Sequence, residues 1–355
     1  MEDKITIGIP TYNRKNELLR LLKSIESEKL DDVYEVLICD NKSSFCIETE
    51  ILAQLSSSFQ VKCRIFKNSV NIGGHGNIKN LYIHCHSKWL WMIGDDDQVT
   101  KGCLDIISQD IKKYPDCSQF RYSIETSING VITEELEDDY KMVSLEDFVN
   151  YYTCKNRSKG NLIFMSNNVI NMEKMSPFIQ YAFTYNPPIS QIIPALVGLD
   201  NKAIEVRYRN KIVCRYVHPE SGTQWNMFRV MLTMSNMCQI PWKSLDSSLY
   251  PKFMEIFIFT SFQEFAYWCF RNKDKISNKD LLTNIYRNLF FYGSGGYHVS
   301  QKEFDSFFHQ YCKNSKKYDY YLEHQKRNAM FRHSLRSILE KLYIIPSKKN
   351  GKCTE

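Results

Sequence analysis

The sequence lacks the features that mark a secreted or membrane-spanning protein. It contains twelve cysteines, yet no two of them form a C-x-x-C pair, and several stand inside apolar runs, as buried reduced thiols do. No apolar signal segment follows Met1, and no apolar run approaches the roughly 18 residues that a membrane span needs. A disulfide framework and a transmembrane helix are therefore not expected, and we predict a cytoplasmic protein.

A strong excess of charge is also missing. The formal net charge is only +6 over 355 residues, the basic residues favour the C-terminal end, and no nucleic-acid recognition motif is visible. We therefore expect no nucleic-acid partner. The hydrophobic content of 43% and the charged content of 24% are typical of a folded protein, and the length suffices for two domains or for one large domain with an appendage.

The most informative stretch is WLWMIGDDD at residues 89–97, an apolar run that ends in three carboxylates. Such a run predicts a buried strand, and its end is exposed to solvent or ligand. Three adjacent carboxylates repel one another unless a cation offsets their charge, and hard oxygen ligands suit Mg²⁺ or Mn²⁺. The alternative is a solvated acidic loop. We favour a cation that holds a phosphorylated substrate.

The first third of the chain alternates between predicted strands and helices. Strands are expected at 5–9, 33–39, 61–66 and 89–93, and helices at 16–27 with Asn16 as a possible N-cap, at 48–55, at 77–85 and at 104–113. This alternation predicts an α/β fold with a mostly parallel sheet, in which ligands bind at the carboxyl ends of the strands. Tyr12, Asp40, Asn71 and the triplet at 95–97 all fall at that edge.

The middle of the chain, residues 118–222, is less regular. Strands are expected at 120–124 and 130–132 with a hairpin turn at Asn129-Gly130, and a capping-box helix is expected to begin at Ser144 with Asp147 as its third residue. The segments 162–165 and 203–216 are predicted to be extended, and 188–199 is predicted to be helical. We expect this part to shape a second substrate site.

The remaining residues, 223–355, are rich in aromatic side chains at helical spacing, which is typical of a helical core. The segment 331–343 combines an apolar face with a basic one. It fits an interfacial anchor on an anionic membrane, and it fits a packed surface helix equally well.

Four of these stretches together resemble the family 2 glycosyltransferases of the GT-A fold, a Rossmann-like nucleotide-sugar fold. They are IGIPTYNR at 7–14, ICDNKS at 38–43, NIG at 71–73 and GDDD at 94–97, and they cover about the first third of the chain. The Asp-Asn-x-Ser sequence after the second strand points within this family to the abequosyltransferase-like branch of O-antigen and capsule enzymes. The expected architecture is a donor half at 1–117, an acceptor half at 118–222 and a helical C-terminal region at 223–355.

The resemblance implies a metal-dependent sugar transfer from a nucleotide-diphosphate donor to a glycan acceptor. A polyprenyl-linked acceptor at the cytoplasmic face of the inner membrane is expected, with the enzyme peripheral to that surface. The implied nucleotide contacts are Pro10, Tyr12, Arg14 and Asp40, with Asp40 at the base, and the implied ribose and metal ligands are Asp95, Asp96, Asp97 and a late histidine, His218. Asn71, Gly73 and His75 lie in a Gly-rich turn, whose backbone can approach a nucleotide closely.

Two departures from the family pattern concern the acidic residues. Gly94 stands where many members have Asp, so the metal register is either Asp95-x-Asp97 or a shifted one centred on Asp96. The acidic pair that supplies the general base of inverting members has no counterpart at 187–191. Glu220 or one Asp of the triplet, such as Asp97, is a substitute, and a retaining mechanism without a base stays open.

Two other functions compete with transfer. The missing acidic pair is compatible with an inactive GT-A-like protein that binds nucleotide sugar as a scaffold or regulator. A Rossmann dehydrogenase is disfavoured, because the glycines at 73–76 do not follow the first strand and lack the G-x-G-x-x-G spacing.

Overall fold

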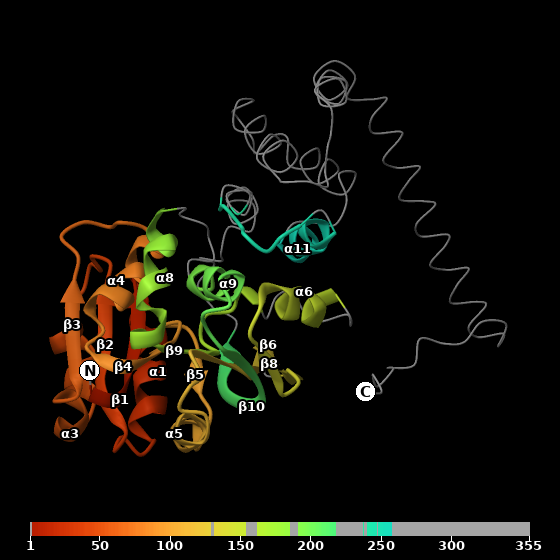
Figure 1. Cartoon of the computed structure of the whole chain (residues 1–355). Helices are drawn as coiled ribbons and strands as arrows, with labels where there is room; N and C mark the ends of the chain where they lie inside the picture. Colours follow the sequence, from red (N-terminus) through yellow and green to blue (C-terminus); the bar gives the residue numbers. More distant parts are fainter. Residues whose placement is uncertain are drawn as a thin grey trace, which may run out of the picture. The chain divides into compact units, whose positions relative to one another are not determined.

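The computed structural model describes residues 2–128, 131–153, 162–184, 191–217, 237, 240–246 and 248–257 (Figure 1). All of them belong to one compact unit, and the chain's second unit, residues 261–282 and 298–355, lies outside the described residues. The predicted helical C-terminal region therefore lies outside them too, except for α11 (Leu249–Phe257). Among the helices that are described, none combines the length and the apolar composition needed to cross a membrane.

Among the described residues, a ten-stranded mixed sheet forms the centre of this unit. Eight strands follow the order β3-β2-β1-β4-β9-β6-β10-β5, while β7 pairs with β6 and β8 pairs with β10. The strands are β1 (Glu2–Thr11), β2 (Val33–Asp40), β3 (Cys63–Lys67), β4 (Ser87–Met92), β5 (Gln98–Val99), β6 (Gln119–Ile128), β7 (Val131–Glu135), β8 (Tyr140–Met142), β9 (Asn168–Asn171) and β10 (Val206–Val217). The helices besides α11 are α1 (Lys15–Glu26), α2 (Ile47–Glu50), η1 (Leu52–Gln54), α3 (Ser57–Gln60), α4 (Gly74–His84), α5 (Cys103–Lys113), α6 (Leu145–Thr153), α8 (Met172–Thr184) and α9 (Ile193–Asp200).

The first four strands are parallel, as the alternating pattern predicts. Strand β9 then runs antiparallel between β4 and β6, while β10 is parallel to β6. One face of the sheet packs a continuous apolar core against α1 and α5, with Leu22, Trp89, Trp91, Ile107 and Phe120 fully buried. Removing this much apolar surface from water is the main force that holds the sheet together.

The parallel register brings the predicted donor residues to one edge. Thr11 pairs with Asp40, and Asp40 pairs with Lys67 on the next strand. On the other side Gly8 pairs with Met92, so β4 ends beside β1 and the triplet at 95–97 follows immediately. The convergence of separate loops at the carboxyl edge, expected from the strand pattern, is confirmed.

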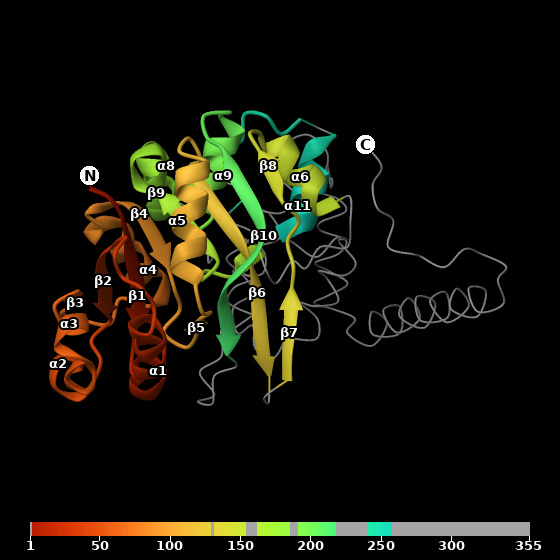
Figure 2. The ribbon, with the colours of Figure 1, turned by 90° about the horizontal axis from the view of Figure 1, so that it is seen from below.

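The second half of the unit adds two long neighbouring strands, β6 and β10, which are flanked by β7 and run side by side in Figure 2. Strand β6 pairs with β7 up to Ile128 and Val131, which confirms the hairpin; its turn residues lie outside the described ranges. The capping box is also confirmed, because the backbone N–H of Asp147 donates to Ser144 Oγ at 3.1 Å and the N–H of Ser144 donates to Asp147 Oδ2 at 2.9 Å.

Some local predictions were wrong. Arg14, not Asn16, is the N-cap residue of α1, and the helix expected at 48–55 breaks into α2 and η1. Helix α4 begins at Gly74, three residues before the expected Asn77. The segment 162–165 is not a strand; the strand lies at β9 instead, where its buried polar residues gave no apolar pattern. The helix expected at 188–199 is observed as α9, and 188–190 lie outside the described ranges.

Candidate active site

The acidic triplet is held in place by the end of β1 and by α1. Thr11 Oγ1 donates to Asp95 Oδ2 at 2.7 Å. Arg14 Nη1 donates to Asp95 Oδ1 at 2.9 Å and to Asp96 Oδ2 at 2.6 Å. Arg20 Nη2 donates to the carbonyl oxygen of Asp96 at 2.8 Å. Both carboxylate oxygens of Asp95 are therefore used within the protein, and Arg14 neutralises part of the charge of the triplet.

Asp97 is held differently from Asp95. Its Oδ2 accepts a hydrogen bond from the hydroxyl of Ser166, which in turn accepts from the backbone N–H of Gly94 at 2.8 Å. Asp97 is only 2% exposed, and within the described residues its buried Oδ1 has no hydrogen-bond partner. A buried carboxylate oxygen without a donor is costly unless a ligand supplies one. Asp97 thus has a buried carboxylate oxygen that a ligand could use, although the backbone of Val217 also acts on this carboxylate.

Gly94 has no side chain, and this leaves room for the carboxylates of Asp96 and Asp97. A Cβ at this position would lie 3.0 Å from Asp96 Oδ1 and 3.0 Å from Asp97 Oδ2. The two carboxylates therefore converge on the space that a side chain at 94 would occupy. An Asp at this position, as many family members have, would also bring a fourth carboxylate into the cluster.

The electrostatics of the triplet fit a divalent cation. Burial raises the pKa of Asp95 to about 6, against the opposing charge of Arg14. Burial also raises the pKa of Asp97 well above its usual range, and the negative charge of Asp96 adds to this effect. Ionised carboxylates are thus destabilised here, and a hard cation would relieve that cost.

No three His, Cys, Asp or Glu side chains are close enough to enclose a metal ion by themselves, as far as the described ranges extend. Mg²⁺ usually binds through one or two carboxylates and completes its shell with water and phosphate oxygens, so a complete protein cage is not required. The residues present fit a cation held by Asp97 and Asp96. The predicted ligand His218 and the candidate base Glu220 lie outside the described residues.

Asp40 lies at the end of β2 and is 1% exposed. Its Oδ1 accepts from the backbone N–H of Ser43 at 2.8 Å, while Oδ2 has no hydrogen-bond partner and lies 3.4 Å from Lys67 Nζ. An ionised carboxylate can only accept hydrogen bonds. Asp40 is therefore suited to a base edge that presents N–H donors.

A buried asparagine network, which the sequence analysis missed, links the loops around Asp40. Asn41 Nδ2 donates to Asn71 Oδ1 at 2.8 Å, and Asn41 Oδ1 accepts from Asn68 Nδ2 at 3.1 Å. Asn68 also donates to Asn77 Oδ1 at 3.0 Å and accepts from Asn80 Nδ2 at 2.9 Å. The signal in the sequence was the close spacing of four asparagines between 68 and 80. These bonds fix the loop at 71–73 relative to the ends of β1 and β2.

Two residues at the same edge adopt the left-handed backbone conformation although they are not glycine. Asn13 has φ of 55° and follows β1, and Lys42 has φ of 72° and follows β2. The Asn13 N–H donates to Ser43 Oγ at 3.0 Å, and Asn13 Oδ1 accepts from the Ser44 N–H at 2.8 Å. Such backbone strain persists only where surrounding contacts enforce it, and it is often found at binding sites.

The other predicted donor residues occupy the same edge. Pro10 is half-buried, and Tyr12 is 44% exposed beside it. Gly73 has φ of 80°, which a side chain would disfavour, and His75 lies in the first turn of α4. Their contacts with a nucleotide remain predictions.

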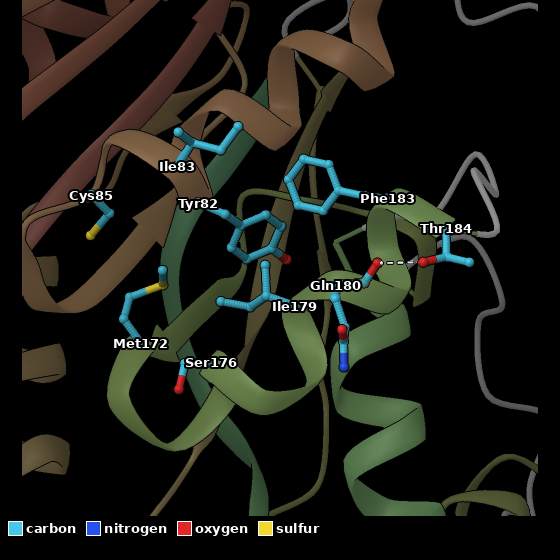
Figure 3. Close-up of a pocket in the computed structure, with 9 residues that line it drawn as sticks. All are labelled: Tyr82, Ile83, Cys85, Met172, Ser176, Ile179, Gln180, Phe183 and Thr184. Atoms are coloured by element: carbon cyan, nitrogen blue, oxygen red, sulfur yellow. Dashed lines mark hydrogen bonds between the residues drawn. The ribbon is translucent and has the colours of Figure 1, made fainter.

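A groove of about 600 Å³ lies elsewhere, between α4 and α8, and is drawn in Figure 3. Tyr82, Ile179 and Phe183 face one another across it. Its wall is tied to the segment before α9, because the Tyr82 hydroxyl donates to the carbonyl oxygen of Gln191 at 3.3 Å. None of the predicted donor residues lines this groove.

The fold matches that of GT-A glycosyltransferase structures. A crystal structure of S. aureus TarS residues 1–349 in complex with UDP-GlcNAc has a TM-score of 0.59 at 10% identity, with 92% of each chain covered. A UDP complex of the same protein gives 0.58 at 11% identity, again with 92% of each chain covered. At these identities the likeness concerns the fold alone.

Residues 6–168 match the model of Glycosyl transferase family 2, so this part of the chain is similar to that family. Abequosyltransferase RfbV of Salmonella typhimurium is 34% identical over 104 residues, which are 29% of this chain and 31% of that protein. A Campylobacter jejuni GalNAc(5)-diNAcBac-PP-undecaprenol beta-1,3-glucosyltransferase is 26% identical over 107 residues, 30% of this chain and 34% of that protein. The alignments thus span about a third of each relative. The predicted family resemblance is confirmed.

Proposed function

We propose that this chain transfers a sugar from a nucleotide-diphosphate donor to a glycan acceptor with the help of Mg²⁺ or Mn²⁺. The observation that carries the proposal is the strand edge that Asp97, with a buried oxygen unbonded in the described residues, shares with Asp40 and the loop at 71–73. One end of this edge suits a cation and a diphosphate, and the other suits a base. The combination is what a nucleotide-sugar donor requires.

We assign separate roles in binding the base, the cation and the diphosphate to the residues of this edge. Asp40 accepts hydrogen bonds from the base, and the asparagine network holds the adjoining loop in position. Asp97 and Asp96 hold the cation, which when bound neutralises the diphosphate as it leaves. Arg14 keeps Asp95 and Asp96 in place, so the charge of the site is organised before the donor arrives.

The comparisons support the donor and the acceptor classes that we propose. TarS, with a similar fold, has been crystallised with UDP and with UDP-GlcNAc. The names of the two relatives describe an abequosyltransferase and a glucosyltransferase that acts on an undecaprenol-linked glycan. We therefore propose a polyprenyl-linked acceptor of surface polysaccharide synthesis, O-antigen or capsule, which the protein meets at the inner face of the membrane.

A thermal-shift screen tests the donor site. The full chain is heated with uridine, thymidine, guanosine, cytidine and adenosine diphosphates, each with and without Mn²⁺. At least one nucleotide is expected to raise the melting temperature more with Mn²⁺ than without it, because a ligand that binds only the folded state stabilises it.

Asp97→Ala should lose the Mn²⁺-dependent increment and turnover of nucleotide sugar, yet retain the melting temperature of the free protein. Full activity in Asp97→Ala contradicts the assignment, and binding without turnover for any acceptor favours the inactive scaffold.

A further inference from the structure

Glu125 lies in one transverse row of the sheet with Gln98, the residue that follows the acidic triplet. Strand β5 pairs Gln98 with Arg215 of β10, and Arg215 pairs with Glu125 of β6. Gln98 follows Asp97 directly. Neighbouring strands are about 4.8 Å apart, so the backbone of Glu125 is roughly 10 Å from that of Gln98. This separation leaves room for a sugar and an attacking hydroxyl beside the diphosphate position.

The side chain of Glu125 extends from the face of the sheet opposite the α1 and α5 core. Ile124 is in that core, and side chains alternate along a strand. Arg121 is on the same face as Glu125, and its Cζ lies 5.6 Å from the centre of the Tyr208 ring. The Tyr208 hydroxyl is in turn 2.8 Å from the hydroxyl of Tyr152 on α6. This face also carries α9, which packs against α6. Glu125 therefore lies in the predicted acceptor half, residues 118–222, on the face of the sheet that carries α6 and α9.

The carboxylate of Glu125 is oriented by an ion pair that uses only one of its two oxygens. Its Oε2 accepts from Arg215 Nε at 2.7 Å, and within the described part of the chain its Oε1 accepts no hydrogen bond. The side chain is 18% exposed, and that of Arg215 is 34% exposed. An ion pair at a partly exposed strand adds little stability on its own. The pair instead orients a carboxylate whose second oxygen is available on the solvent side of the site.

The triplet is less suited to accept a proton from the acceptor. Asp95 is occupied by Thr11 and Arg14, while Asp96 and Asp97, whose carboxylates lie close together beside Gly94, are the proposed cation ligands. A carboxylate that holds a cation is a poor base, because the cation stabilises its unprotonated form. Glu125 is free of this constraint.

We propose that Glu125 is the general base of the transfer, an inference that rests on the function proposed above. The acceptor hydroxyl gives its proton to Glu125 while its oxygen forms the new bond to C1 of the sugar. The bond from C1 to the diphosphate oxygen breaks, and its electron pair leaves with the nucleoside diphosphate. A single displacement of this kind inverts the configuration at C1.

The test measures nucleoside diphosphate release by the full chain, with and without acceptor. Donors are a panel of UDP-, dTDP-, GDP- and CDP-sugars with Mn²⁺, and acceptors are octyl glycosides and polyprenyl-diphosphate sugars. Glu125→Gln should lower the acceptor-dependent kcat by about 10²–10⁴-fold, the range for loss of a general base. The donor KM and the Mn²⁺-dependent thermal shift should not change. Glu125→Ala should regain part of its rate with added formate, and the product should have inverted configuration.

Two controls separate chemistry from structure. Glu146→Gln, on the exposed surface of α6, should behave as the wild type. Arg215→Gln breaks the same ion pair but keeps the carboxylate, so it should lose much less rate than Glu125→Gln. A Glu125→Gln rate close to the wild type, a retained configuration, or equal losses in the Arg215 and Glu125 variants would overturn the role of Glu125. A wild type without turnover for any pair of substrates would instead refute the proposed function, and the inference with it.

Discussion

The asparagine network makes a measurable prediction at Asn77, whose side chain joins three elements. Asn77 Nδ2 donates to the carbonyl oxygen of Cys39 at 2.7 Å, and Asn77 Oδ1 accepts from Asn68 Nδ2 at 3.0 Å. Asn77→Ala removes the side-chain partner of the Cys39 carbonyl oxygen and of one N–H of Asn68, whose amide still donates to Asn41. Each such group costs about 1–3 kcal/mol, so the free energy of unfolding should fall by about 2–6 kcal/mol. For a unit of this size the melting temperature should drop by about 4–24 °C.

The assay is thermal unfolding followed by fluorescence, with Asn210→Ala as the matched control because Asn210 is exposed on β10. The control should unfold with the wild type. Well below its melting temperature, Asn77→Ala should also bind nucleoside diphosphate more weakly, since the loop at 71–73 is no longer fixed to β2. The reasoning is refuted if Asn77→Ala and Asn210→Ala unfold at the same temperature, because the network would then contribute no stability.

Two further predictions concern the cation and the membrane. Gly94→Ala should weaken Mn²⁺ binding, measured by titration with nucleotide present, because its methyl group would displace the carboxylates of Asp96 and Asp97 at 3.0 Å; unchanged Mn²⁺ affinity would contradict this. Removal of residues 326–355 should weaken sedimentation with anionic liposomes by at least about tenfold, since each basic residue near such a surface contributes about 1 kcal/mol; equal sedimentation of both chains would exclude the predicted anchor.

The sequence predicted the donor half of the fold well, because its signals there are local. Apolar strands that end in polar loops define a parallel sheet, and the rule that ligands bind at the carboxyl edge then places Asp40, Asn71 and the triplet together without any distance information. The capping box at Ser144 was found for the same reason, since its donor and acceptor lie three residues apart.

The acceptor half was harder to predict, because its organisation depends on contacts between distant residues. Strand β9 is lined by the buried Asn168 and Asn171, so its pattern is polar although both residues are inaccessible to water. Ser166 holds Asp97 across 69 positions of sequence, and Glu125 meets Arg215 across 90. No spacing rule reveals such pairs, which become visible only when the strand register is known.

The three carboxylates of the triplet, adjacent in sequence, are not equivalent in the fold. Asp95 would have to give up Thr11 or Arg14 to bind a cation, whereas Oδ1 of Asp97 makes no hydrogen bond to a described residue. Asp96 Oδ1 lies beside Gly94, close to the Asp97 oxygen that Ser166 holds. With Arg14 counted, the ionised triplet carries two net negative charges, which a single divalent cation would balance. The raised pKa values of Asp95 and Asp97 show that burial opposes this charge in the free protein. We therefore infer that the cation binds through Asp97 and Asp96, and that Asp95 anchors the loop to β1 and α1.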